Sequence, residues 1–365
     1  MRIVIKLGTS TLTDGTPHLS PPLLVELARQ ISQLQSSGHQ TVLVSSGAIA
    51  AGRERLGFPQ LPKDIPAKQM LAAIGQPRLM ALYERIFDLY GLTAAQVLLT
   101  RVDLASRHRY LNARNTLIAL MAQSIIPIVN ENDTVATEEI RVGDNDNLSA
   151  LVANLVDADW LILLTDQRGL YTADPRVDPD ARLVEEIATR KIAPELWRAA
   201  GGSGRGMGTG GMATKLQAAD LARRSGACCV IAWGKESNIL LRLVEGEKLG
   251  TRFPAVATSV ESRKRYILSA RQAPGQLSVD AGAARALRRG GSLLPVGLMA
   301  VEGTFERGDT VRVVTSDGGE IARGIVNYDS RDLAQIVRCP SEAIESILGY
   351  HFGDEVIHRN DLVLL

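Results

Sequence analysis

The first part of the chain, roughly 250 residues, alternates short apolar runs with amphipathic stretches, and this alternation limits the possible fold more than any other feature. Strands that alternate with helices pair in parallel, because each helix carries the chain back along the sheet before the next strand begins. The pattern therefore predicts a doubly wound α/β domain with a mostly parallel central sheet. The predicted strands are Ile3–Ile5, Thr41–Val44, Ala95–Leu99, Ile125–Val129, Trp160–Leu164 and Cys228–Ala232.

Helix signals fall between these strands. Ser20 and Pro21 are typical of an N-cap and first helical residue, so a helix is predicted to begin there. A longer helical segment covers 68–90, and Pro77 is expected to break or kink it because proline has no N–H to donate. Further helices are predicted near 112–123, 146–157 and 212–225.

The sequence changes character near residue 261, where the charged stretch Glu261–Arg265 precedes short β segments with Gly and Asp turns. We expect a larger α/β domain over 1–258, a linker over 259–274 and a small, mainly β domain over 275–365. The predicted strands of the small domain include Thr310–Val314, Ile321–Val326 and Glu355–Ile357.

Composition narrows the functional classes. A formal net charge of +1 gives no overall attraction to nucleic acid or to an anionic membrane. The sequence shows no long apolar run and no leader-like segment, so it predicts no transmembrane helix and a cytoplasmic location. Three cysteines form no C-x-x-C pair and five histidines show no metal-binding spacing, so neither a disulfide framework nor a protein-held metal centre is predicted.

Five polar segments lie after predicted strands. Because parallel strands end at one edge of a sheet, we expect these segments to converge on one site. Each segment also has a plain structural explanation, since glycines can permit close packing and Asp or Asn can cap a helix or form a turn. The five segments are Lys6–Ser10, Ser45–Gly52, Asn130–Asp133, Gly143–Asn147 and Thr165–Tyr171.

Two of these segments carry charges suited to phosphate chemistry. Lys6 supplies a positive charge, and Gly8 lets the backbone approach a phosphate group. Asp144 and Asp146 precede a predicted helix, and Asp146 or Asn147 could cap that helix. Two aspartates so close together also suit a site that orders lysines or holds Mg²⁺-linked phosphates.

A glycine-rich stretch at 201–211 leads into the helix predicted over 212–225. Backbone N–H groups at the start of a helix bind phosphate, and Lys215 stands in the first turn. Gly206, Gly208 and Gly211 match G-x-G-x-x-G, but the run does not directly follow a short strand, so we reject a dinucleotide site. A flexible linker is the alternative interpretation, and Lys215 argues against it.

Together these motifs occur in the order of the glutamate 5-kinase family, a branch of the amino acid kinase superfamily, which the chain resembles over essentially its whole length. The C-terminal part resembles a PUA domain through Ser292–Pro295 and Gly308–Asp309. The other segments that carry the resemblance are Lys6–Ser10, Ser46–Gly52, Asn130–Asp133, Gly143–Ala150, Thr165–Tyr171 and Gly208–Lys215.

The resemblance implies a fold and a reaction. The fold is a three-layer αβα sandwich with a mostly parallel central sheet, followed by the PUA domain. The reaction is transfer of the γ-phosphoryl group of ATP to the γ-carboxylate of L-glutamate, which gives L-glutamyl 5-phosphate in the first step of proline biosynthesis. Mg²⁺ would be carried by the ATP, and no protein metal ligand is assigned.

The resemblance also implies roles for individual residues. Lys6 and Lys215 would stabilise the transferring group, and Asp146 would hold these lysines in place. The residues implied to bind glutamate are Ser46, Asp133, Asn145 and Asp144. Those implied to bind ATP are Lys6, Gly8, Thr165, Asp166, Thr209, Gly210, Gly211, Met212, Ala213, Thr214 and Lys215.

Elementary chemistry agrees with this assignment. A γ-carboxylate has a reference pKa of about 4.3, so it is already a nucleophile at neutral pH and needs no general base. The chemical task that remains is to position two anionic reactants and to neutralise the charge between them. Two lysines, backbone N–H groups and Mg²⁺ are suited to that task.

Other functions stay open at this level. Kinases of acetylglutamate, aspartate, carbamate or uridylate share the lysines and the glycine-rich loop, but not the Gly143–Asp146 segment with this C-terminal part. PUA domains commonly bind RNA, yet residues 275–365 hold nine Arg and no Lys against thirteen Asp and Glu, so RNA binding is not expected. The resemblance further implies inhibition by proline, a dimer or tetramer, and channelling of the product to glutamate-5-semialdehyde dehydrogenase.

Overall fold

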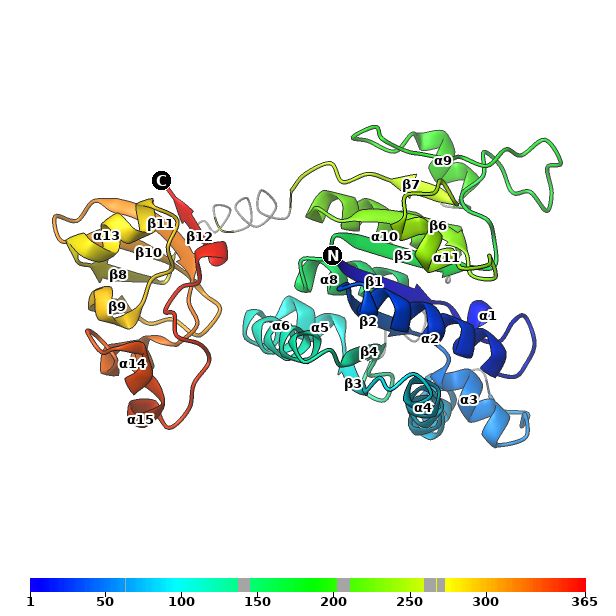
Figure 1. Ribbon diagram of the computed structural model, residues 1–365, viewed down its shortest axis with the longest axis horizontal. Helices are drawn as coiled ribbons and strands as arrows, with labels where there is room; N and C mark the ends of the chain where they lie inside the picture. The colour runs from blue at the N-terminus through cyan, green and yellow to red at the C-terminus, as the bar shows by residue number, and fades with distance from the viewer. Residues whose placement is uncertain (63, 137–144, 202–210, 259–266, 268–272) are drawn as a thin grey trace. The chain divides into compact units, whose positions relative to one another are not determined.

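The computed structural model describes residues 1–62, 64–136, 145–201, 211–258, 267 and 273–365 (Figure 1). The chain divides into two compact units, Met1–Leu104 with Ala113–Thr258 and Ala105–Asn112 with Ser259–Leu365. The domain borders drawn from the sequence stay a prediction. Among the described residues, no helix combines the length and the apolar character that crossing a bilayer requires.

A seven-stranded sheet forms the centre of the first unit, in the order β3-β4-β2-β1-β5-β6-β7. All neighbouring strands run parallel except β7, which pairs antiparallel with β6. The mostly parallel sheet predicted from the alternation is confirmed. The strands are β1 (Arg2–Leu7), β2 (Gln40–Ser45), β3 (Ala94–Leu99), β4 (Ile126–Glu131), β5 (Trp160–Thr165), β6 (Cys228–Trp233) and β7 (Thr251–Phe253).

Helices cover both faces of this sheet, which makes the three-layer sandwich (Figure 1). Helices α8 and α10 pack on one face, and α2, α4 and α11 lie on the other. The helices that lie wholly or, for α5 and α6, partly in this unit are α1 (Thr9–Leu12), α2 (Pro21–Ser36), α3 (Ala48–Arg55), α4 (Ile65–Asp88), α5 (Arg101–Ala105), α6 (Arg107–Ala122), α8 (Asn145–Leu155), α9 (Pro194–Ala199), α10 (Met212–Ser225) and α11 (Ile239–Val244).

The alternation of side chains along β1 decides where its lysine lies. Ile3, Ile5 and Leu7 belong to the hydrophobic core that α2, α4 and α11 build against the sheet. Successive side chains of a strand point to opposite faces, so Lys6 lies on the face that α8 and α10 cover. Strand β1 also stands at the switch point of the sheet, between β2 and β5, where ligands bind in open α/β folds.

Of two expectations about local structure, the strand at Glu355–Ile357 was wrong, and the break or kink at Pro77 is settled only in part. Helix α4 continues through Pro77, so it does not break there, and a kink stays a prediction. Proline removes the hydrogen bond to the carbonyl of Ala73, and both residues are exposed, so water can satisfy that carbonyl. Glu355–Ile357 forms no strand but a single bridge from Ile357 to Leu293, and β12 (Leu362–Leu364) pairs with β11 instead.

Helices α3 and α4 approach each other closely at two glycines. A Cβ on Gly75 would lie 1.7 Å from the carbonyl oxygen of Ala48, and one on Gly52 would lie 2.0 Å from that of Leu71. No larger side chain fits at either position without moving a backbone. Gly52 therefore serves close helix packing, which is the structural explanation weighed for that segment.

The second unit is built on a five-stranded sheet in the order β12-β11-β10-β8-β9, with its own hydrophobic core. Its β content was predicted from the sequence. The elements are β8 (Gly275–Val279), α13 (Ala281–Arg288), β9 (Leu298–Gly303), β10 (Thr310–Thr315), β11 (Glu320–Ile325), α14 (Ser330–Gln335), α15 (Ile344–Leu348) and β12 (Leu362–Leu364), with short 3₁₀ turns at Pro295–Gly297, Ser341–Ala343 and Arg359–Asp361.

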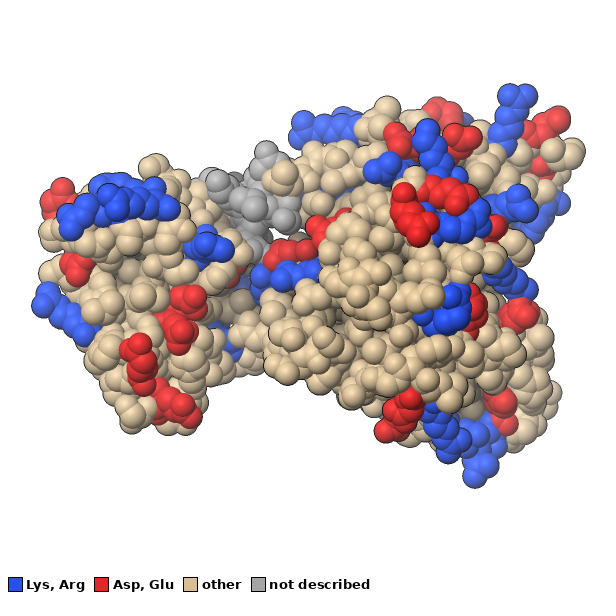
Figure 2. Space-filling model, viewed as in Figure 1, with Lys and Arg blue, Asp and Glu red and all other residues tan. Residues whose placement is uncertain are grey.

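Exposed basic side chains gather near the end of α13, where Arg285, Arg288 and Arg289 lie (Figure 2). The same unit exposes acidic side chains elsewhere on the face shown in Figure 2, in keeping with its acidic balance. A binder of the phosphate backbone needs a continuous basic stripe, so this charge distribution does not favour RNA as a partner.

Candidate active site

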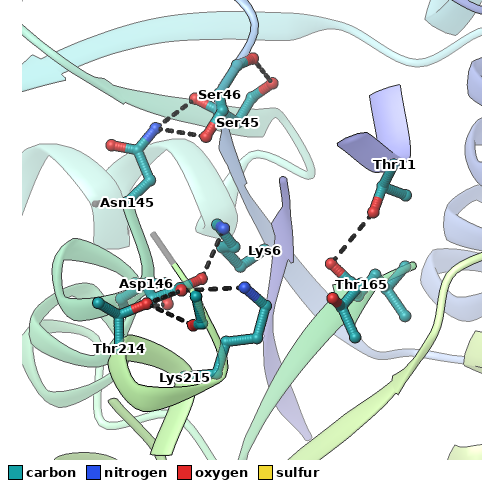
Figure 3. Close-up of polar contacts among 12 residues, drawn as sticks. Lys6, Thr11, Ser45, Ser46, Asn145, Asp146, Thr165, Thr214 and Lys215 are labelled. Carbon is teal, nitrogen blue, oxygen red and sulfur yellow. Dashed lines mark hydrogen bonds and ion pairs between the residues drawn. The ribbon is translucent and has the colours of Figure 1, made fainter. Parts of the chain in front are cut away.

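Three buried charges from three separate elements meet at the carboxyl edge of the sheet (Figure 3). Lys6 comes from β1, Asp146 from the first turn of α8 and Lys215 from the first turn of α10. Lys6 Nζ lies 2.5 Å from Asp146 Oδ1, and Lys215 Nζ lies 3.2 Å from Asp146 Oδ2. The carboxylate thus joins the two lysines into one ion-pair cluster.

The electrostatics of the cluster favour an ionised Asp146. Burial raises the pKa of this carboxyl group, but the charges of Lys6 and Lys215 outweigh burial and lower the pKa to about 2. Asp146 is therefore an anion at neutral pH, and two lysines with one carboxylate leave one net positive charge in the site.

Thr214 links the cluster to the start of α10. Its Oγ1 lies 2.7 Å from Asp146 Oδ2 and 2.8 Å from the carbonyl oxygen of Gly211, so its single proton is shared between these two acceptors. Gly211 is the N-cap of α10, where unpaired N–H groups and the helix dipole favour an anion. The helix start and Lys215 therefore present positive potential on the same side.

A second polar cluster lies at the ends of β2 and β4. The side-chain Nδ2 of Asn145 contacts three oxygens, at 2.9 Å from the carbonyl of Ser45, 3.1 Å from Ser46 Oγ and 2.8 Å from Asn130 Oδ1. Asn145 directly precedes Asp146 on α8, so one helix start holds both clusters. The structure thus brings Ser46 and Asn145 together, as the sequence predicted for residues of one site.

Asp133 lies in the turn after β4, and the pKa of its carboxyl group is raised. Burial raises its pKa to about 6, and none of the described residues forms an ion pair with it. A carboxylate in this state gains from a cationic ligand, because an ammonium group would supply the missing counter-charge.

A cavity of about 910 Å³ lies beside the lysine cluster. It is lined by five of the residues predicted to bind a nucleotide, by further members of the segments predicted to converge there, and by a wall that the sequence did not identify. The predicted residues are Thr165, Asp166, Gly211, Met212 and Lys215. The further members of predicted segments are Ser10, Gln167, Leu170, Tyr171 and Gly201, and the additional wall consists of Thr172–Arg176, Glu195 and Arg198–Ala200.

The additional wall comes from two excursions of the chain. The first is closed at its base by a bridge between Tyr171 and Leu183, and the second is helix α9. Tyr171 is the last residue of the polar segment Thr165–Tyr171, so the residues that follow it could also have been predicted to line the site. Nothing in the short stretch Pro194–Ala199 pointed to a ligand.

The remaining predicted residues fall into two groups. Gly8 lies beside the cluster, since a Cβ there would be 3.4 Å from Lys6 Nζ, while Ala213 and Thr214 are buried in α10 and do not line the cavity. Three predicted residues lie outside the described part of the chain: Asp144, Thr209 and Gly210.

Comparison with known proteins shows which families the two parts of the chain match. Residues 1–232 match the amino acid kinase family, and residues 275–348 match the PUA domain. The chain is 55% identical over 364 residues to a protein of Herpetosiphon aurantiacus named glutamate 5-kinase, with 100% of this chain and 98% of that protein covered. A protein of the same name from Deinococcus radiodurans is 54% identical over 366 residues, with both chains covered completely.

The chain belongs to the glutamate 5-kinase branch of the amino acid kinase family.

Membership in the glutamate 5-kinase branch accounts for both units. The amino acid kinase match spans most of the seven-stranded sheet with its lysine cluster and cavity, and the PUA match falls on the unit with the five-stranded sheet. Photobacterium profundum has a further relative named glutamate 5-kinase, 55% identical and covered over 96% of its length, so the match extends to whole proteins.

The lysine cluster generates a stability prediction. Asp146→Asn leaves two buried ammonium groups facing each other, so we expect the free energy of unfolding at neutral pH to fall by about 3–5 kcal/mol. The folded-state pKa lies below the unfolded one, so this contribution is present above about pH 4 and is lost as pH falls toward 2. Denaturant unfolding of both proteins at several pH values measures the difference.

Thr214→Val is the matched control for this measurement, because it removes a hydrogen bond to the same carboxylate oxygen without changing charge. We expect it to lower the free energy of unfolding by only about 1 kcal/mol. An Asp146→Asn variant as stable as the wild type at neutral pH would contradict the role given to the carboxylate.

Proposed function

We propose that this protein transfers the γ-phosphoryl group of ATP to the γ-carboxylate of L-glutamate. The observation that carries this proposal is the buried Lys6–Asp146–Lys215 cluster beside a cavity of nucleotide size. The names of the relatives support glutamate as the acceptor.

In the proposed reaction, an oxygen of the γ-carboxylate forms a bond to the γ-phosphorus. The bond from that phosphorus to the β–γ bridging oxygen breaks, and ADP leaves with the electron pair. No proton has to move, because the attacking carboxylate is already ionised at neutral pH. Lys6 and Lys215 would lower the barrier by neutralising the charge that gathers on the transferring group and on ADP.

Asp146 acts through the lysines in this proposal. It accepts contacts from both ammonium groups and so fixes where they stand before substrate arrives. Electrostatic stabilisation is most effective when the charges need no rearrangement during the reaction. Asp146 is therefore a positioning residue rather than a group that touches the substrate.

Mg²⁺ would reach the site on the nucleotide and would neutralise phosphate charge there. The donor set fits this view, because both oxygens of Asp146 face lysines and are not arranged as metal ligands. Mg²⁺ commonly binds through one or two carboxylates and the substrate phosphates rather than through a complete protein cage.

The amino acid would lie between the lysine cluster and the loops after β2 and β4. Ser46 and Asn145 would bind the glutamate chain, and Asp133 would pair with the α-ammonium group. Asp144 is included in this set from the family resemblance. On the nucleotide side, Gly8, Thr165, Asp166 and the segment 209–215 would line the ATP site, and of that set Thr165 Oγ1 donates to Asp166 Oδ1 at 3.0 Å.

Further parts of the proposal rest on the family resemblance. They are inhibition by proline at a site that overlaps the glutamate site, a homodimer or homotetramer, a cytoplasmic location and channelling of product to glutamate-5-semialdehyde dehydrogenase. In this scheme residues 1–258 form the catalytic domain, 259–274 the linker and 275–365 the PUA domain.

A hydroxylamine trapping assay tests the reaction. With ATP, Mg²⁺ and L-glutamate, the acyl phosphate should be captured as a hydroxamate, and reactions without ATP give the background. Acetylglutamate and aspartate are run in parallel because related kinases phosphorylate them. The proposal fails if glutamate gives no ATP-dependent hydroxamate or gives less than either competitor.

The state of Asp133 generates a pH prediction. Its pKa is about 6 in the free protein, and only the ionised form pairs with the ammonium group of glutamate. As pH falls from about 7 to about 5, protonation should therefore raise KM for glutamate about tenfold. The γ-carboxyl group of glutamate stays mostly ionised over this range, so it does not mask the effect.

Asp133→Asn provides the matched control for this pH profile. The variant should have a raised KM for glutamate at pH 7 and little further change down to pH 5, while KM for ATP stays close to the wild-type value. A wild-type KM for glutamate that does not change between these pH values would rule out this role for Asp133.

A further inference from the structure

Helix α4 carries three polar side chains at intervals of seven residues, Gln69, Gln76 and Tyr83. Seven residues make almost two complete turns, so the three lie on one face of the helix at steps of about 10 Å. Each of them contacts a different segment at the ends of β2 and β4. This face of α4 therefore runs alongside the loops that we assign to the amino acid.

Gln69 and Tyr83, the outer two residues, hold the loops after β4 and β2 in place. Gln69 Nε2 donates to the carbonyl oxygens of Thr134 and Ala136 at 3.4 and 3.2 Å, beside Asp133. The buried hydroxyl of Tyr83 lies 2.7 Å from Ser45 Oγ, which donates to the carbonyl oxygen of Ser46 at 2.8 Å. Because Ser45 uses its proton for Ser46, Tyr83 is the donor in the first of these bonds.

Asn130 fixes the orientation of the side-chain amide of Gln76, the middle residue of the three. The backbone N–H of Glu131 can only donate, and it lies 2.8 Å from Asn130 Oδ1, so that atom is the amide oxygen. Asn130 Nδ2 therefore points to Gln76 and donates to its Oε1 at 2.8 Å. Gln76 must present its oxygen to Asn130 and direct its Nε2 elsewhere.

Gln76 Nε2 is buried and has no hydrogen-bond partner among the described residues. A buried amide nitrogen with two unused protons is unfavourable unless an acceptor arrives. Its neighbour Asn130 also accepts from Asn145, which contacts Ser46 and directly precedes Asp146. The unused donors therefore lie at the end of a hydrogen-bond chain that runs from Ser46 through Asn145 and Asn130 to Gln76.

We infer that Gln76 Nε2 donates a hydrogen bond to the α-carboxylate of the amino acid substrate. This inference rests on the proposed function, in which the lysine cluster receives the γ-carboxylate and the opposite end of the substrate carries the α-carboxylate and the α-ammonium group. Asp133 complements the ammonium group, and the amide of Gln76 complements the carboxylate. Together they select an α-amino acid over a simple dicarboxylate.

The test is Gln76→Glu, which keeps an oxygen for Asn130 but removes both donors and places a negative charge at the α-carboxylate. We expect KM for glutamate to rise about 10- to 100-fold, as hydrogen bonds to charged groups predict. KM for ATP should stay within about twofold, because the nucleotide site does not include this residue. Gln123→Glu adds the same charge at an exposed position and is the matched control.

A second substrate tests whether the effect of Gln76→Glu depends on the α-carboxylate. The α-amide of glutamate lacks the α-carboxylate charge and offers an N–H group, so Gln76→Glu should reduce the wild-type preference for glutamate over this amide. The inference is wrong if KM for glutamate and this preference both match the wild type. Wild-type protein that neither binds glutamate in calorimetry nor phosphorylates it refutes the proposed function, and the inference falls with it.

Discussion

The carboxylate of Asp146, held between Lys6 and Lys215, is the interaction on which the rest of the site depends. Two buried ammonium groups without a counter-ion would repel each other and lose hydration. Asp146 supplies the counter-ion and fixes the positions of both ammonium groups, at distances of 2.5 and 3.2 Å from its oxygens to the two nitrogens. The sheet and two helix starts are arranged so that these three residues meet.

The fold explains why they meet. Strand alternation places Lys6 on the face covered by α8 and α10, and both helices direct their N-termini to the carboxyl edge of the sheet. Each helix start contributes one charged side chain and favours nearby negative charge. The cavity proposed for the nucleotide and the loops proposed for the amino acid then lie on either side of one charged centre, which is the arrangement that phosphoryl transfer between two anions requires.

Much of this could be predicted from local sequence. Helix α10 begins at Met212 and ends at Ser225 as expected, because a glycine run precedes it and Gly226 ends it in a left-handed conformation. The core strands were found within a few residues, since buried parallel strands appear as apolar runs. The meeting of Ser46 with Asn145 was also expected from the strand-end rule.

The missed features depend on contacts that no local pattern encodes. Strand β7 is three residues long, and the outer wall of the cavity comes from irregular segments and the short α9. The sequence analysis did not single out Gln69, Gln76 and Tyr83, because their role depends on which loops α4 contacts. The sequence left a break and a kink at Pro77 both open, because the exposure of that residue, rather than its identity, decides whether the helix continues.

In the proposed reaction the two lysines act mainly on the transition state. Single-turnover measurement of phosphoryl transfer to glutamate in Lys6→Met and Lys215→Met tests this role, with the dissociation constant of ATP measured alongside. We expect a loss of about 2.7–4 kcal/mol in transition-state stabilisation, or roughly 100- to 1000-fold in rate, with a much smaller change in ATP binding. Wild-type transfer rates in either variant, or a loss confined to ATP affinity, would contradict it.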